Sequence, residues 1–366
     1  MVAADRLQMK ILALVTDAFG GPGGIAAYNR HFLTALAEQG HEVLVLPRYG
    51  EAAALPAGLT QAQARNGRLF YVYSLLRQLL RDRSFDLVWC GHIGMAALAA
   101  RVAAVVGCPW WLQIHGIDAW TPCDRTRQSA IRSASLVTAV SRYTRRRFLA
   151  WAPVPPDRVK VLPNVVEPCY TPGTKSQKLL QRYAARDCKI LLTVGRIAKA
   201  EAYKGHDRII RLMPRLLERH TNLVYLIAGD GDGRPELERL AAETGVEEQV
   251  RFAGNVAADE LVDHYRIADV FVMPSTGEGF GIVYLEAMAC GIPAIGLDTD
   301  GSIDPLGALS NGRAVPEHLL FETICESLDG AGSRASGAVS GFQPTDLSTD
   351  VRRLLRNAAF SCASKP

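Results

Sequence analysis

Two glutamates, Glu278 and Glu286, flank a glycine-rich turn in the stretch whose residue types point most directly to chemistry. Seven residues separate them, the apolar residues 270–273 before them are typical of a buried strand, and helix-forming residues follow. At such a junction, backbone N–H groups and the helix dipole converge where a phosphate can bind. Carboxylates accept hydrogen bonds from sugar hydroxyls. We therefore expect a pocket for a sugar joined to a phosphate. The alternative is that Glu278 caps the helix and Glu286 is solvated.

Two cations follow another predicted strand, residues 190–194. Arg196 comes directly after Gly195, and Lys204 follows eight residues later. Two positive charges at one strand end suit a diphosphate, which is charged on both phosphoryl groups. Solvation of both at the surface is the alternative. It is weakened because ligands bind at the carboxyl ends of parallel strands.

Three further positions follow predicted strands. Asp230, between two glycines, is predicted either to line a nucleotide site or simply to form a tight turn. The glycine-rich turn at 20–24, which includes Gly24, lets a ligand approach the backbone closely, but it lacks the dinucleotide fingerprint. His115 is expected to face a crevice and to donate a hydrogen bond to a sugar hydroxyl, with a purely structural histidine as the alternative.

Strands and helices alternate along the whole chain, which predicts an α/β protein built on parallel sheets. A turn-rich segment at 163–173 marks a domain boundary, so we expect a domain at 1–168 and a second at 169–366. Both are predicted to be Rossmann-like and to face each other across a cleft. Residues 330–341 are typical of a flexible linker, and 347–359 of a terminal helix. The predicted strands are 11–15, 43–46, 87–90, 111–114, 136–140, 159–162, 190–194, 224–228, 250–253, 270–273 and 294–296.

Composition limits the cellular context. The 366 residues are 48% hydrophobic and 21% charged, with no uninterrupted apolar run of about 18 residues, so we expect no transmembrane helix. Residues 1–10 lack the long apolar region of a signal peptide. Eight cysteines without Cys-x-x-Cys or zinc spacing favour reduced thiols in the cytoplasm.

Charge is unevenly distributed. Residues 1–170 hold 19 Lys and Arg against 11 Asp and Glu, and the remainder holds 22 against 26. A basic first half favours an anionic partner, such as a membrane surface. Arginine-rich composition that follows a GC-rich genome explains it equally well.

Several motifs together resemble the retaining, GT-B-fold glycosyltransferases of family 4, also described as glycosyl transferases group 1. The resemblance covers roughly residues 10–315, and its last motif is highly specific. The motifs are GGPGGIAAYNRHFLTAL, QIHG, AVSRYTRRRF, VLPNVVEP, LLTVGRI, YKGHDRII, LIAGDGDGRPELERLA, VRFAGNV and ADVFVMPSTGEGFGIVYLEAMACGIPAIG.

The resemblance implies a role for each matching residue. Arg196 and Lys204 match the basic pair on the donor diphosphate. Glu278 matches the first glutamate of the motif, at the transferred sugar, and Glu286 the second, on the ribose. Phe280, Gly281 and Ile282 match residues whose backbone amides donate to the sugar and phosphate. Gly24 matches a glycine close to the diphosphate, and His115 matches a histidine that contacts the sugar. Arg251 and Phe252 fall where the base is usually bound.

The implied reaction moves a hexose from a UDP- or GDP-linked sugar to a lipid-linked or polysaccharide-precursor acceptor, without metal or cofactor. A nucleotide-sugar epimerase or hydrolase and a non-catalytic sugar-nucleotide-binding protein are the alternatives. No nucleic-acid partner is expected. After residue 296 the acidic residues Asp298, Asp300 and Asp304 depart from the family arrangement, and residues 330–366 match little.

An amphipathic, aromatic and basic segment begins at Arg68 and ends at Arg83. Related enzymes use a comparable element to rest on anionic membrane, so the resemblance implies a peripheral protein on the inner face of the cell membrane. An ordinary packed helix with solvated arginines is the alternative.

Overall fold

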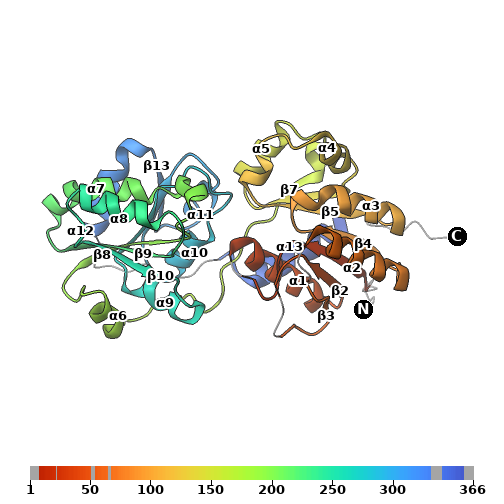
Figure 1. Ribbon diagram of the computed structural model, residues 1–366, viewed down its shortest axis with the longest axis horizontal. Coiled ribbons are helices and arrows are strands. Elements are labelled where there is room, and N and C mark those ends of the chain that lie inside the picture. The colour runs from red at the N-terminus through yellow and green to blue at the C-terminus, as the bar shows by residue number, and fades with distance from the viewer. Residues whose placement is uncertain (1–7, 22, 51–53, 65–66, 331–339, 358–366) are drawn as a thin grey trace, which may run out of the picture. The chain divides into compact units, whose positions relative to one another are not determined.

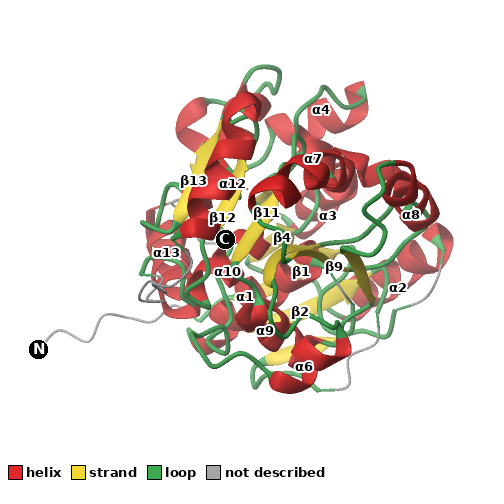
Figure 2. Ribbon diagram, turned by 90° about the vertical axis from the view of Figure 1, so that its left-hand side faces the viewer, coloured by secondary structure: helices red, strands yellow, loops and turns green. Residues whose placement is uncertain are grey.

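The computed structural model describes residues 8–21, 23–50, 54–64, 67–330 and 340–357. Within these ranges the chain forms two compact units, one of residues up to 165 together with those from 344 onward, and one of residues 166–343. Each is built on a parallel sheet with helices on its faces (Figures 1 and 2). The prediction of an α/β protein with two parallel-sheet domains is confirmed. The expected placement of the domains across a cleft stays a prediction.

The first unit holds a seven-stranded sheet in the order β3-β2-β1-β4-β5-β6-β7, with every pairing parallel. Continuous apolar runs form its central strands because helices cover both faces of such a sheet. The strands are β1 (Lys10–Val15), β2 (Glu42–Pro47), β3 (Leu59–Gln61), β4 (Leu87–Cys90), β5 (Trp110–Ile114), β6 (Leu136–Ala139) and β7 (Val159–Val161). The helices are α1 (Gly24–Glu38), α2 (Arg68–Arg81), α3 (Ala96–Val106), α4 (Arg125–Arg132), α5 (Arg142–Leu149) and α13 (Pro344–Asn357).

Aromatic side chains join this sheet to α1. Phe32 is fully buried and stacks on Trp89, with ring centroids 4.4 Å apart, and meets Trp111 edge-on at 5.1 Å. Such ring pairs add to the stabilisation that burial alone provides. They hold α1, and the turn before it, over the centre of the sheet.

The second unit holds a six-stranded parallel sheet in the order β10-β9-β8-β11-β12-β13. This is the strand order of a dinucleotide-binding Rossmann fold. The strands are β8 (Lys189–Val194), β9 (Leu223–Ala228), β10 (Val250–Gly254), β11 (Val270–Met273), β12 (Ala294–Leu297) and β13 (Gly312–Val315). The helices are α6 (Gln177–Arg182), α7 (His206–Arg219), α8 (Arg234–Glu243), α9 (Ala258–Ile267), α10 (Ile282–Ala289), α11 (Ile303–Leu306) and α12 (Leu320–Asp329), with the 3-10 helix η4 (Lys199–Lys204).

The last helix corrects the predicted domain division. Sequence placed residues 169–366 in one domain, but α13 belongs to the first unit and packs against α1 (Figure 1). Its buried residues Leu347, Val351 and Leu354 lie on one face, and Gln39 donates a hydrogen bond to the carbonyl of Ser348 at 2.9 Å. An amphipathic pattern shows that a helix must cover a core without showing which core it covers.

Most predicted elements match the observed ones, and two edge strands were missed. β3 and β13 are short, each buries one apolar residue, and neither shows the apolar run of the central strands. Most of the predicted linker (331–339) and the end of the predicted terminal helix (358–359) lie outside the described residues, as do residues 1–7 of the N-terminal segment. Among the described residues, no helix is both long enough and apolar enough to cross a bilayer.

Candidate active site

The second unit gathers most of the predicted residues at one place in its sheet. β8 and β11 are neighbours, and the strand order reverses between them. Loops that leave the carboxyl ends of two such strands form the usual ligand crevice of an open α/β sheet. The loop after β8 carries Arg196 and Lys204, and the loop after β11 carries Glu278.

The loop after β8 lies tightly against the loop after β9. The amide of Gly195 donates to Ala228 and that of Ile197 to Asp230, at 3.0 and 2.9 Å. A Cβ at Gly229 would lie only 1.9 Å from the Gly195 carbonyl oxygen, so glycine is required for this close approach. The Gly-Asp-Gly turn therefore positions the segment that carries the cations, and a nucleotide contact of Asp230 stays a prediction.

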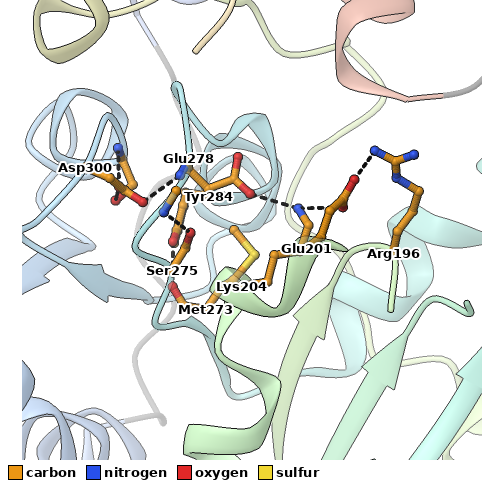
Figure 3. Close-up of polar contacts among 10 residues, drawn as sticks. Arg196, Glu201, Lys204, Met273, Ser275, Glu278, Tyr284 and Asp300 are labelled. Atoms are coloured by element: carbon orange, nitrogen blue, oxygen red, sulfur yellow. Dashed lines mark hydrogen bonds and ion pairs between the residues drawn. The ribbon is translucent and has the colours of Figure 1, made fainter. Parts of the chain in front are cut away.

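Lys204 forms an ion pair with Glu278, with Nζ 2.8 Å from Oε1 (Figure 3). Both side chains are mostly buried, at 13% and 16% exposed. Burial acts to lower the pKa of Lys204, but the charge of Glu278 and the hydrogen bond to it outweigh burial, so that the pKa is raised. Lys204 is a fixed positive charge at the strand ends.

Arg196 differs from Lys204 in its exposure. Its side chain is 78% exposed, and its guanidinium pairs with the carboxylate of Glu201. The other carboxylate oxygen of Glu201 lies 3.8 Å from the Lys204 ammonium. Arg196, Glu201, Lys204 and Glu278 thus form a row of alternating charges (Figure 3). The Arg196 side chain lies largely in solvent, so it has room to reorient toward a ligand.

A buried carboxylate supports the Glu278 loop from the other side. Asp300 is fully buried and accepts hydrogen bonds from the Glu278 amide at 2.7 Å and from the Ser302 hydroxyl at 2.6 Å (Figure 3). Burial raises the pKa of Asp300, against these hydrogen bonds. The buried Ser275 accepts from the Gly277 amide at 3.1 Å. The acidic residues that depart from the family pattern therefore include one that fixes the loop.

The helix that follows this loop begins at a positive-φ glycine. Gly281, with φ of 81°, caps α10, and Ile282 is its first residue. The first amides of a helix lack partners within it and attract anions. Phe280 is buried, with its ring 6.0 Å from that of Phe342, so only its backbone is suited to contact a ligand.

Glu286 lies one helical turn into α10 among tyrosines. Tyr265 donates to its Oε2 at 2.6 Å, and Tyr170 also donates to it. Burial raises the pKa of Glu286 to about 7, although both hydrogen bonds act to lower it. Glu286 is therefore not a solvated helix residue. It is an acceptor that titrates near neutral pH.

The residues predicted to hold a base lie at the β9–β10 edge of the sheet. Arg251 and Phe252 are half-buried on β10. The Arg234 guanidinium lies 5.1 Å from the centre of the Phe252 ring and 3.6 Å from the Asp230 carboxylate. Arg234, which the sequence analysis did not single out, thus contacts both Asp230 and Phe252.

Two predicted residues, His115 and Gly24, belong to the first unit. The Nε2 atom of His115 lies 2.8 Å from the carbonyl oxygen of Gly91. A carbonyl can only accept, so Nε2 carries the proton and Nδ1 of the neutral ring is an acceptor. Burial lowers the pKa of His115 to about 4, which keeps it neutral at pH 7. A hydrogen bond between His115 and a sugar hydroxyl stays a prediction, and this tautomer would make Nδ1 its acceptor where the sequence analysis expected a donor.

Gly24 is the first residue of α1, after the turn that follows β1. A Cβ added there would meet no heavy atom of the described residues within 4 Å. Glycine is therefore not required there by packing. Open space at a helix start leaves room for a ligand next to the backbone.

Comparison with known proteins defines the class. Residues 22–169 match the family described as Glycosyltransferase Family 4, and residues 177–329 match the family described as Glycosyl transferases group 1. An uncharacterized glycosyltransferase of Methanocaldococcus jannaschii is 30% identical over 318 residues, 79% of this chain and 80% of that relative. The chain belongs to the group 1 glycosyltransferases.

Named enzymes are among the relatives. The GDP-mannose-dependent alpha-(1-6)-phosphatidylinositol monomannoside mannosyltransferase of Mycolicibacterium smegmatis is 34% identical over 238 residues, and the match spans 61% of each chain. The GDP-mannose-dependent monoacylated alpha-(1-6)-phosphatidylinositol monomannoside mannosyltransferase of Corynebacterium glutamicum is 28% identical. That match covers 91% of this chain and 92% of the relative.

Solved structures confirm the GT-B fold. The Anabaena protein HepE in complex with UDP-glucose has a TM-score of 0.75, covers 95% of this chain and 100% of its own, and is 22% identical. WaaG, a glycosyltransferase involved in lipopolysaccharide biosynthesis, has a TM-score of 0.63 at 18% identity and covers 96% of this chain and 100% of its own.

Sequence reasoning missed several residues at this site. Glu201 bridges the two cations, and Tyr265 and Tyr170 hold Glu286, whereas Asp300 was noted in the sequence without its role of holding the Glu278 loop. An acid between two cations was a visible signal for Glu201. The tyrosines offered no signal, since they are distant in sequence from Glu286.

Proposed function

We propose that the chain transfers a hexose from a nucleoside-diphosphate sugar to a lipid-linked or polysaccharide-precursor acceptor, retaining the anomeric configuration and using no metal. The observation that carries the proposal is the mostly buried Lys204–Glu278 pair at the strand-order reversal, beside the start of α10. It combines a fixed cation for a phosphate with a carboxylate for sugar hydroxyls.

Each group at this place has a task in the reaction. Lys204, a reoriented Arg196 and the first amides of α10 would stabilise the negative charge that develops on the leaving diphosphate. Glu278 would accept hydrogen bonds from the transferred sugar, and Glu286 from the ribose. Positive charge is thus supplied by the protein itself, which supports the proposal of metal-independent transfer.

The remaining predicted residues complete this assignment. Phe280, Gly281 and Ile282 would offer backbone amides, and the base would lie near Arg251 and Phe252, beside Gly195 and Asp230. In the first unit, His115 would accept from a sugar hydroxyl through Nδ1, and Gly24 would leave room for the diphosphate. Retention would follow from same-face attack with the leaving phosphate as base.

The donor and acceptor classes follow from the relatives. Two of them are named as GDP-mannose-dependent enzymes acting on phosphatidylinositol monomannosides, and HepE was solved with UDP-glucose. We therefore propose a GDP- or UDP-linked hexose as donor and a lipid-linked acceptor. The protein would work at the cytoplasmic face of the membrane.

Helix α2 supplies a surface for that location. Its buried side is Tyr71, Leu75 and Leu79, yet Leu69 is 85% exposed and Leu80 is 78% exposed. Its charged residues are all arginines, at 68, 77 and 81. An exposed apolar stripe with basic flanks is suited to an anionic bilayer surface.

The test is ligand binding followed by transfer. Wild-type protein is screened by thermal shift with UDP, GDP and ADP, since a bound ligand raises the unfolding temperature by mass action. Lys204→Ala and Glu286→Ala should keep their fold and lose transfer from the matching sugar nucleotide. Lys199→Ala, which removes an exposed lysine of the same η4 helix, is the matched control and should retain activity.

The alternatives give different results. Rapid product formation from the donor alone would indicate an epimerase or a hydrolase. Tight nucleotide binding without turnover would indicate a non-catalytic binding protein. Wild-type-like transfer by both Lys204→Ala and Glu286→Ala would contradict the site assignment.

A further inference from the structure

Glu201 interacts with Arg196 and Lys204, the two cations that are proposed to bind the diphosphate. One of its carboxylate oxygens pairs with the Arg196 guanidinium, and the other lies 3.8 Å from Nζ of Lys204 (Figure 3). Its side chain is only 15% exposed, although Arg196 itself lies largely in solvent. A carboxylate held away from water beside two cations interacts with them more strongly than an exposed one.

The position of Glu201 is built into the fold. The η4 helix is tied to the loop after β9 by the Lys199 amide, which donates to the Asp232 carboxylate at 2.9 Å. At its other end, the Thr276 amide donates to the Tyr203 carbonyl at 3.0 Å. The Tyr203 ring also packs on Gly277, where a Cβ would lie 2.6 Å from it. The backbone on both sides of Glu201, which itself lies at a kink in η4, is therefore tied to neighbouring loops.

The charges around Glu201 determine how it affects the binding of a diphosphate. Arg196 and Lys204 carry two positive charges, and Glu201 and Glu278 carry two negative ones, so the row is neutral. A diphosphate that approaches the two cations must compete with Glu201. A free nucleoside diphosphate carries more negative charge than the same diphosphate esterified to a sugar, because its terminal phosphate is unblocked. A fixed carboxylate therefore repels the product more than the donor.

We propose that Glu201 is a resident counter-ion of the donor site, which occupies Arg196 and Lys204 in the absence of ligand and speeds release of the nucleoside diphosphate after transfer. This inference rests on the proposed function. Glu201 acts as a positioning and specificity-determining residue, because it sets the relative affinity of product and donor through the two cations.

The test compares product and donor affinity in Glu201→Gln, which keeps the shape and removes the charge. Dissociation constants are measured by calorimetry for UDP and GDP, and for UDP-glucose and GDP-mannose. The dissociation constant of the nucleoside diphosphate should fall by about tenfold, and that of the sugar nucleotide by clearly less. The product inhibition constant should fall in parallel, and raising the salt concentration should reduce the difference.

Two further variants keep the test decisive. Glu201→Ala also removes the charge and should tighten diphosphate binding, so it replaces the glutamine variant if that one does not fold. Glu322→Gln removes an exposed carboxylate that pairs with Arg219 in the same unit, and should leave all dissociation constants unchanged.

The outcomes separate this inference from the proposed function. If the wild type binds no nucleoside diphosphate, the proposed function fails. If the wild type binds one and the neutral variants bind it equally or more weakly, Glu201 only preorganises the cations and the inference is wrong. Equal tightening of product and donor would also overturn it.

Discussion

At the scale of single residues, the Lys204–Glu278 pair contributes to the stability of the fold as well as to the proposed donor site. Breaking a mostly buried ion pair leaves one charge without its partner, whereas removing both charges does not. We expect Lys204→Met and Glu278→Gln each to lower the free energy of unfolding by about 2 kcal/mol. The double variant should lose less than the sum of the two. A double-mutant cycle by urea unfolding measures this coupling, and additive losses would show that the two charges do not interact.

Glu286 gives a pH-dependent prediction. Its pKa is raised from 4.5 to about 7, so its protonated form stabilises the fold below pH 4.5 and this contribution is lost as pH rises through 7. Glu286→Gln cannot ionise. Relative to wild type, we expect the variant to gain on the order of 2 kcal/mol between pH 5 and pH 8, because the helix residue keeps part of its surface in solvent.

The measurement is urea unfolding at both pH values. All five tryptophans lie in the first unit, so tryptophan fluorescence follows that unit and circular dichroism follows both. The pH-dependent difference should appear only in circular dichroism. A stability difference that is constant from pH 5 to pH 8 would show that Glu286 is ionised throughout.

At the scale of elements, helix α2 exposes large apolar side chains in the part of the chain that the structure describes. Leu69, Tyr73, Leu76 and Leu80 repeat at spacings of four, three and four residues and are all more than half exposed. One face of the helix therefore packs on the sheet, while the opposite face is left apolar. Such a patch marks an interaction surface.

Vesicle binding tests this face. Leu69→Ser combined with Leu80→Ser should abolish co-sedimentation with vesicles of phosphatidylglycerol and phosphatidylcholine, and should not change stability because both side chains are exposed. Val105→Ser on α3, also an exposed apolar residue, is the control. Unchanged sedimentation would rule out α2 as the membrane surface. A wild-type dimer that the double variant dissociates would identify a second copy of the chain as the partner.

At the scale of the whole molecule, the chain returns to its first unit after completing the second. Helix α13 buries Val351 fully in the first unit. A charge at that position has no compensation, so Val351→Asp should destabilise the first unit by about 3 kcal/mol. The tryptophan-fluorescence transition should shift to lower urea concentration, while nucleoside diphosphate affinity stays at the wild-type value.

Thr349→Asp adds the same charge on the exposed side of α13 and serves as the control. If Val351→Asp instead shifts only the transition seen by circular dichroism, the helix covers the second unit, as the domain division from sequence predicted.

Much of the fold and of the site follows from local pattern. The central strands of a parallel sheet are buried on both faces, so they form apolar runs that can be recognised without a structure. Residues directly after those runs lie at the carboxyl edge of the sheet. Arg196 and Lys204 were placed at the end of one such strand and Glu278 at the end of another for this reason, and the structure shows that Lys204 and Glu278 form an ion pair. Edge strands β3 and β13 lack the pattern because each buries only one residue.

The amino-acid order alone determined that this chain forms two parallel sheets and which strand ends carry the charged groups, because apolar runs and side-chain periodicity are set by residues that are neighbours in sequence. Only the tertiary structure decided the partners. Glu201 between two cations, Asp300 under the Glu278 loop, the tyrosines on Glu286, the proton on Nε2 of His115 and the return of α13 all depend on distances between segments far apart in the chain. Electrostatic interactions and hydrogen bonds act over a few ångströms in space, and sequence separation does not measure that distance.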